Sequence, residues 1–238
     1  GKVGKNGHTV HLYNGPDVQP FRNAGIKELV WDLNPYLTIL EESKEVSWNV
    51  GDLPGLEYKN IHNDYIKNWE ATHGLEPENS LPKIYYTPKQ MHYLDPFLPR
   101  HLQNLGPFFD PNKPPNYGLI EISSITLKYD AKTVENIVNT IIAEAEYIPF
   151  YVIESRHQSA KFQIKGASPI WVEDLKQICD LLHNCKTFVS LNSGLHSLAA
   201  AVQRFGNFTQ HCILPQNDYK WITEGRRFVY PGINYIKE

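Results

Sequence analysis

The segment from Thr187 to Val202 constrains the fold of this chain more than any other part of the sequence. A short apolar run ends at Asn192-Ser193-Gly194 and gives way to an alanine-rich stretch, which predicts a strand, a tight turn and the start of a helix. We expect Ser193 to cap this helix by accepting a hydrogen bond from the backbone N–H of His196. The free N–H groups of the first turn and the positive end of the helix dipole would then favour an anion, most often a phosphate.

The side chain of His196 lies in the same first turn and adds a donor that can become charged near neutral pH. An ordinary strand-to-helix turn with a polar cap explains the same residues equally well. The motif by itself therefore leaves an anion site and a plain structural turn as open alternatives.

Strand and helix patterns alternate through the C-terminal half of the chain. The predicted strands are Tyr117–Ser123, Pro149–Ile153, Thr187–Leu191 and Gln210–Leu214. A first helix, capped by Asp130, carries the apolar stripe Val134, Ile137, Val138, Ile141, Ile142 and Ala145, and a second is lined by Val172, Leu175, Ile178, Cys179 and Leu182. This order predicts an α/β fold with a parallel sheet, whose ligands bind beyond the carboxyl ends of the strands.

A proline-rich stretch over residues 105–118 divides the chain into two predicted lobes, 1–115 and 116–238. The N-terminal lobe is less regular. Its predicted strands are Thr9–Tyr13, Glu28–Trp31 and Val46–Val50, and a helix is predicted over Ile61–His73. The aromatic and proline-rich residues 84–109 are typical of loops packed over a small core, and a surface facing a sugar or acceptor is the alternative.

Composition restricts the class of protein. A net charge of -3 gives no reason to expect nucleic-acid binding, because proteins that bind the phosphate backbone usually carry a basic surplus. No apolar run approaches the roughly 20 residues of a transmembrane helix, and no signal peptide is recognisable. Three cysteines, Cys179, Cys185 and Cys212, do not make a disulfide framework. We therefore expect a cytoplasmic protein.

Two motifs of the C-terminal half resemble a known family. Ile122-Ser123-Ser124 is followed by Lys128-Tyr129 and the first helix, and Phe188–Leu191 leads into Asn192-Ser193-Gly194, His196 and Ala199-Ala200-Ala201. This pattern resembles the nucleotide-sugar-binding domain of GT-B glycosyltransferases of the ADP-heptose:lipopolysaccharide heptosyltransferase type. The resemblance implies two Rossmann-like lobes, of which the N-terminal one is truncated or irregular here.

The same resemblance implies a metal-independent glycosyltransferase that takes a nucleotide diphosphate sugar and a glycan or lipopolysaccharide-like acceptor, with no further cofactor. No Asp-x-Asp pair is present, which is consistent with the absence of a metal. Residues implied to contact the nucleotide or its diphosphate are Ser123, Ser124, Lys128, Glu154, Asn192, Ser193, Gly194, Leu195 and His196.

The chain departs from the family at two places. Only Leu195 separates Gly194 from His196, where the family usually has two residues, and the opening loop that carries the catalytic acid is not recognisable in Gly-Lys-Val-Gly-Lys-Asn-Gly. The catalytic base is therefore unassigned. A non-catalytic nucleotide- or sugar-binding relative and a nucleotide-sugar epimerase remain as alternatives. The epimerase ranks lower because Leu195-His196 stands where those enzymes usually carry a glutamate pair.

Overall fold

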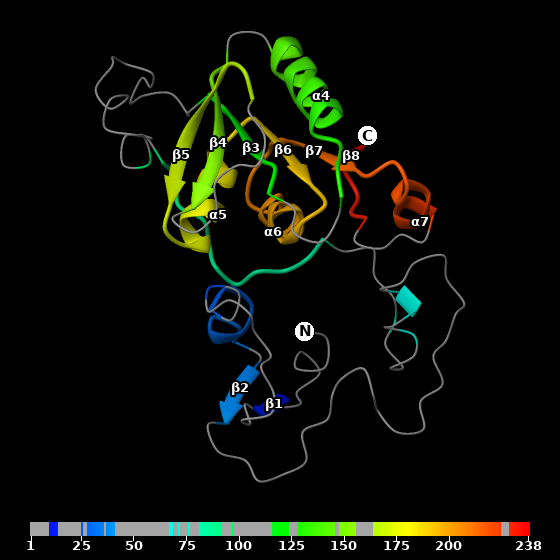
Figure 1. Ribbon diagram of the computed structural model, residues 1–238. Helices are drawn as coiled ribbons and strands as arrows, with labels where there is room; N and C mark the ends of the chain where they lie inside the picture. Colours follow the sequence, from blue (N-terminus) through cyan, green and yellow to red (C-terminus); the bar gives the residue numbers. More distant parts are fainter. Residues whose placement is uncertain are drawn as a thin grey trace.

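A computed structural model describes residues 10–13, 25, 28–35, 37–40, 67–68, 71, 76, 81–91, 97, 116–123, 128–145, 148–155, 164–224 and 229–238 (Figure 1). In the C-terminal half the strands are β3 (Gly118–Glu121), β4 (Phe150–Ser155), β5 (Ala167–Val172), β6 (Thr187–Leu191), β7 (Thr209–Leu214) and β8 (Ile233–Lys237). The helices are α4 (Ala131–Glu144), α5 (Leu175–Asn184), α6 (Gly194–Val202) and α7 (Tyr219–Glu224).

The six strands form one parallel sheet in the order β5-β4-β3-β6-β7-β8. The chain runs outward from β3 to β5, then returns to the middle and runs outward again from β6 to β8. The strand order thus reverses between β3 and β6, which is the point where open α/β sheets bind ligands. The predicted α/β class and the four predicted strands are confirmed.

Two strands of this sheet, and β2 (Leu37–Leu40) in the N-terminal half, were absent from the sequence prediction. β5 includes Pro169 and ends at Val172, a residue that the sequence pattern had placed in the following helix. Proline lacks a backbone donor and is tolerated on an edge strand, and β5 is an edge of this sheet. The other strand, β8, is the opposite edge. Edge strands need less apolar sequence than central ones, so their pattern is weaker.

The sheet is the middle of three layers. Along β3 the side chain of Leu119 belongs to the apolar cluster of α5 and α6, whereas Ile120 belongs to the cluster of α4. Both are fully buried, as expected for a central parallel strand. α4 therefore covers one face, and α5 and α6 cover the other (Figure 1). Since side chains alternate, Glu121 shares the α5/α6 face with Leu119.

The predicted helix α4 begins as expected. Asp130 is its N-cap and accepts a hydrogen bond from the Thr133 backbone N–H at 2.8 Å. The stripe is confirmed, because Val134, Val138 and Ile141 are buried. In α5 the same capping role is taken by Asp174, which accepts from the Gln177 N–H at 2.8 Å.

In the N-terminal half, β1 (Val10–Tyr13) pairs in parallel with β2 (Leu37–Leu40). The predicted strand over Glu28–Trp31 is wrong: Glu28–Asp32 forms a π-helical turn, η1, in which the Leu33 N–H donates to the Glu28 carbonyl at 3.2 Å. A short apolar run is compatible with both a strand and a buried helical turn, so the pattern does not distinguish them. Here the turn buries Leu29.

Residues 81–91 run alongside α5. The Tyr86 hydroxyl donates to Asp180 at 2.9 Å, the Lys89 N–H donates to the same carboxylate at 2.7 Å, and the Asn184 amide donates to the Lys89 carbonyl at 2.8 Å. Leu29 and Ile84 belong to the apolar cluster of α5 and α6. Described parts of the N-terminal half thus share a core with the C-terminal sheet.

Several predictions for the N-terminal half fall on residues outside the described part. They are the strand Val46–Val50, the proline-rich boundary up to residue 115 and most of the helix Ile61–His73, of which the described residues 67, 68 and 71 are helical. The division into lobes 1–115 and 116–238 therefore stays a prediction. None of the helices described is both long and apolar enough to cross a membrane.

Candidate functional site

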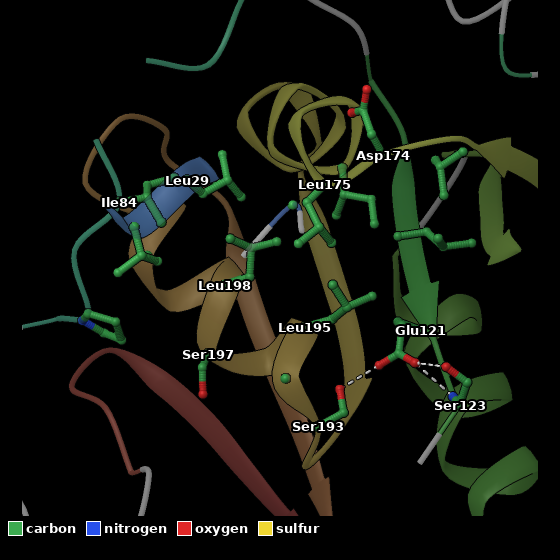
Figure 2. Close-up of a pocket in the computed structure, with 18 of the residues that line it drawn as sticks. Leu29, Ile84, Glu121, Ser123, Asp174, Leu175, Ser193, Leu195, Ser197 and Leu198 are labelled. Carbon is green, nitrogen blue, oxygen red and sulfur yellow. Dashed lines mark hydrogen bonds between the residues drawn. The ribbon is translucent and has the colours of Figure 1, made fainter. Parts of the chain in front are cut away.

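A pocket of about 790 Å³ lies on the α5/α6 face of the sheet, beyond the carboxyl ends of β3 and β5 (Figure 2). Its apolar wall includes side chains from η1, residues 81–91, α5 and α6. These are Leu29, Ile84, Leu175, Ile178, Leu195 and Leu198. At its polar end stand Glu121, Ser123 and Ser193, which come from either side of the reversal between β3 and β6.

Glu121 organises the polar end. Its Oε1 accepts hydrogen bonds from the backbone N–H of Ser123 at 2.8 Å and from the Ser123 hydroxyl, and its Oε2 accepts from the Ser193 hydroxyl at 2.7 Å (Figure 2). The carboxyl group joins the end of β3 to the start of α6, and only 2% of the residue is exposed. It is a buried acid at the edge of the pocket.

Burial governs the acidity of Glu121. Loss of solvation raises the pKa of its carboxyl above the ordinary value, and the hydrogen bonds from Ser123 and Ser193 act in the opposite direction. A raised pKa in a pocket is a physical sign of a functional group, although buried structural acids show it too.

The pocket carries more acidic than basic side chains, which is unusual for a site that binds a phosphate. Among the described residues that line it, the charged or ionisable acids and bases are Glu121, Glu173, Asp174 and Lys83. Three carboxyl groups and one ammonium leave the lining electronegative when all are ionised. A dianionic ligand would be held there mainly by backbone N–H groups and hydroxyls.

The residues of the predicted motif at the start of α6 do not all lie at the pocket. Ser193, Gly194 and Leu195 line the pocket, and a Cβ added to Gly194 would meet no heavy atom within 4 Å. Ser193 occupies the N-cap position, but its side chain makes no capping hydrogen bond. The predicted bond from the His196 N–H to Ser193 is therefore wrong, and the partner of the hydroxyl is Glu121, to which it donates.

The side chain of His196 does not reach the pocket. The residue is fully buried between α6, β7 and β8. The Gln210 amide nitrogen donates to the His196 carbonyl at 3.0 Å and to its Nδ1 at 2.9 Å, and Nε2 lies 3.3 Å from the Tyr235 hydroxyl. Since an amide nitrogen can only donate, Nδ1 accepts, and a neutral ring then carries its proton on Nε2. The prediction that this side chain donates to an anion is wrong.

The Lys128-Tyr129 element does lie next to the Asn192 turn. The Tyr129 hydroxyl accepts from the Asn192 N–H at 3.1 Å and donates to the Ile213 carbonyl at 3.2 Å. Lys128 and Asn192 flank the carboxyl edge of the sheet but do not line the pocket, and Lys128 is exposed.

Two other predicted residues also fall outside the pocket lining. Ser124 lies outside the described residues. Glu154 sits one position beyond Ile153, which lines the pocket, so the alternation of the strand places it on the α4 face. A contact between Glu154 and a ligand in this pocket has no support from the structure.

Sequence reasoning missed Glu121 and the apolar wall from Leu29 and Ile84. A signal for Glu121 was present, because an acidic residue interrupts the apolar run Gly118-Leu119-Ile120-Glu121-Ile122 at the carboxyl end of a central strand. The wall had no local signal, since it forms only when distant segments pack on α5 and α6.

No protein-family model matches the chain, and no curated protein matches it. Among solved structures, it is similar to a dodecameric iron-containing heptosyltransferase, TibC, determined in complex with ADP-D-beta-D-heptose. The TM-score is 0.52 at 16% identity. The match covers 90% of this chain and 53% of that one, so this chain spans about half the length of its neighbour.

At this identity the likeness concerns the fold alone. It agrees with the six-stranded parallel sheet and flanking helices, and so with the fold class that the sequence predicted. Within the described residues, no group of three or more histidine, cysteine, aspartate or glutamate side chains is placed to hold a metal ion.

Proposed function

We propose that this chain is a glycosyltransferase-like protein of the heptosyltransferase type that binds a nucleotide diphosphate sugar in the pocket at the β3/β6 reversal. The carrying observation is the position of the pocket: it lies at the strand-order reversal of a sheet whose fold is similar to a heptosyltransferase. The acceptor would be a glycan or a lipopolysaccharide-like molecule, the setting cytoplasmic and the reaction metal-independent.

The two ends of the pocket suit two parts of such a ligand. Apolar side chains of α5 and α6, such as Leu175 and Leu198, would pack against the base. Backbone N–H groups at Gly194 and Leu195, with the hydroxyls of Ser123 and Ser193, would donate to the diphosphate. Negative charge develops on the leaving diphosphate during glycosyl transfer, and these donors would stabilise it.

A non-catalytic nucleotide-sugar-binding protein is the second candidate. The carboxyl-rich lining favours it, because Lys83 is the one cation among the described lining residues and a leaving diphosphate needs positive charge. Turnover separates the two candidates. A nucleotide sugar that is bound but neither hydrolysed nor transferred points to the binding protein.

The first experiment is calorimetric titration of the chain with ADP, GDP, UDP and CDP. We expect saturable binding of one nucleotide. Binding should be weakened at least about tenfold in Leu198→Trp, because the indole ring takes up space in the pocket. Phe205→Trp is the matched control, since it introduces the same ring at an exposed position outside the pocket. If none of the four binds, or if Leu198→Trp binds as well as the control, the proposed site is wrong.

A further inference from the structure

Three hydrogen-bond donors at the polar end of the pocket are already engaged. The hydroxyls of Ser123 and Ser193 both donate to Glu121, and so does the Ser123 backbone N–H. The two hydroxyls are among the groups that would donate to a phosphate under the proposed function. The Glu121 carboxyl group, with three donors directed at it, thus lies where the ligand's anion would lie.

A carboxylate and a phosphate cannot both occupy this end without cost. Glu121 is almost fully buried, and in a site screened from water two like charges repel far more strongly than in solution. Within the described residues, no ion pair neutralises Glu121. A proton on the carboxyl removes the repulsion and also turns one oxygen from an acceptor into a donor.

We propose that Glu121 is a specificity-determining residue of the pocket, which admits a phosphate group only together with a proton on its own carboxyl. The proposal rests on the proposed nucleotide-sugar site. It makes binding of a nucleoside diphosphate tighter as the pH falls. A neutral hydroxylated ligand, in contrast, would bind with no such linkage.

The groups around Glu121 support this linkage. Burial raises the pKa values of Tyr129, before α4, and of Cys212, on β7, and the Glu121 charge adds to this effect; neither residue supplies a positive charge. Glu173, Asp174 and Lys83 line the same pocket. Burial raises the pKa of Glu121 itself, which brings its protonation closer to neutral pH.

The test is calorimetry with ADP on the full chain between about pH 5.5 and 8.5, in wild type, Glu121→Gln and Glu173→Gln. The glutamine amide keeps an acceptor for Ser123 and resembles the protonated acid in shape and charge. Glu173→Gln removes the same charge from the same lining without touching the two serines. The ionisation of ADP is common to all three proteins, so their differences report on the protein.

We expect Glu121→Gln to bind ADP about tenfold more tightly than wild type at the alkaline end, and the two to converge toward the acidic end. Glu173→Gln should keep the pH dependence of wild type. Titration of wild type in buffers of different ionisation enthalpy should show proton uptake on binding at a pH where ADP is fully ionised. This last measurement needs no variant and stands even if Glu121→Gln folds poorly.

Two results overturn the proposal while leaving the nucleotide site intact. One is ADP binding with the same pH dependence in wild type and Glu121→Gln, without proton uptake. The other is weaker binding to Glu121→Gln at every pH, which would make the ionised carboxylate a direct ligand contact. If ADP, GDP, UDP and CDP fail to bind any of the three proteins, the proposed function falls together with this inference.

Discussion

Two buried polar clusters lie on either side of α6, and they differ in what they face. Toward β3, Glu121 accepts from Ser193 and borders the pocket. Toward β7 and β8, His196 is enclosed by Gln210 and two tyrosine rings, with centroids 5.4 Å from Tyr230 and 5.7 Å from Tyr235. Both clusters come from the same turn, yet only the first has an open side.

This difference shows that two side chains of one short polar motif can have different roles because they point in different directions. Ser193 and His196 are separated by one helical turn, but the first lies between the sheet and the pocket and the second lies inside the core. We therefore expect substitutions in the enclosed cluster to change stability at constant ligand affinity. Substitutions in the open cluster should change the pH dependence of stability and the pH dependence of ligand affinity.

The largest effect is expected for His196→Ala. It removes a buried ring, leaves the Gln210 amide without its Nδ1 partner and opens a cavity next to Tyr235. A loss of about 3 kcal/mol in the free energy of unfolding is expected, measured from urea denaturation midpoints. Affinity for the nucleotide of the proposed site, measured well below the denaturation temperature, should stay within about twofold of wild type. A much larger loss of affinity with unchanged stability would mean that His196 belongs to the open cluster.

The second effect concerns Glu121→Gln and depends on pH. The folded pKa of Glu121 is raised above the ordinary value of 4.5, so the stability that its protonated form contributes is present below that value and is lost as the pH rises through the folded pKa. Relative to the variant, wild type should lose stability with rising pH by at most about 1.4 kcal/mol per pH unit. Parallel pH profiles of the two proteins in thermal unfolding would contradict a raised pKa.

The sequence predicted the elements that have a strong local pattern. The stripe on α4, its Asp130 cap and the run Thr187–Leu191 were all identified, because burial on one helix face or in a central strand leaves a regular apolar period. The direction of the side chains at the ends of these elements was not predictable. Ser193 bonds to Glu121, a residue 72 positions away, and local capping preference does not report such a partner.

The same limit explains two errors far from the motif, on the candidate residue Glu154 and on the segment Glu28–Asp32. Glu154 was expected just beyond the end of a strand, but β4 extends to Ser155 and the pleat turns Glu154 to the α4 face; a one-residue uncertainty in register reverses that outcome. The η1 turn was taken for a strand, since four residues carry too little pattern. Its role as a pocket wall depends on packing against α5 and on the bond from the Tyr85 N–H to the Leu29 carbonyl at 3.0 Å.

The smallest effect comes from comparing two N-cap positions that border the pocket. Asp174 caps α5, so Asp174→Ala should cost about 1 kcal/mol of unfolding free energy. Ser193→Ala removes no cap from α6, and its direct effect on helix stability should be below about 0.5 kcal/mol. It does remove a hydrogen bond that lowers the pKa of Glu121, so the loss of stability on raising the pH should move to higher pH. Urea denaturation across a pH series measures both quantities. If Ser193→Ala instead lost about 1 kcal/mol of unfolding free energy and its pH profile did not move, the Ser193 side chain would act as a cap of α6 and not as a partner of Glu121.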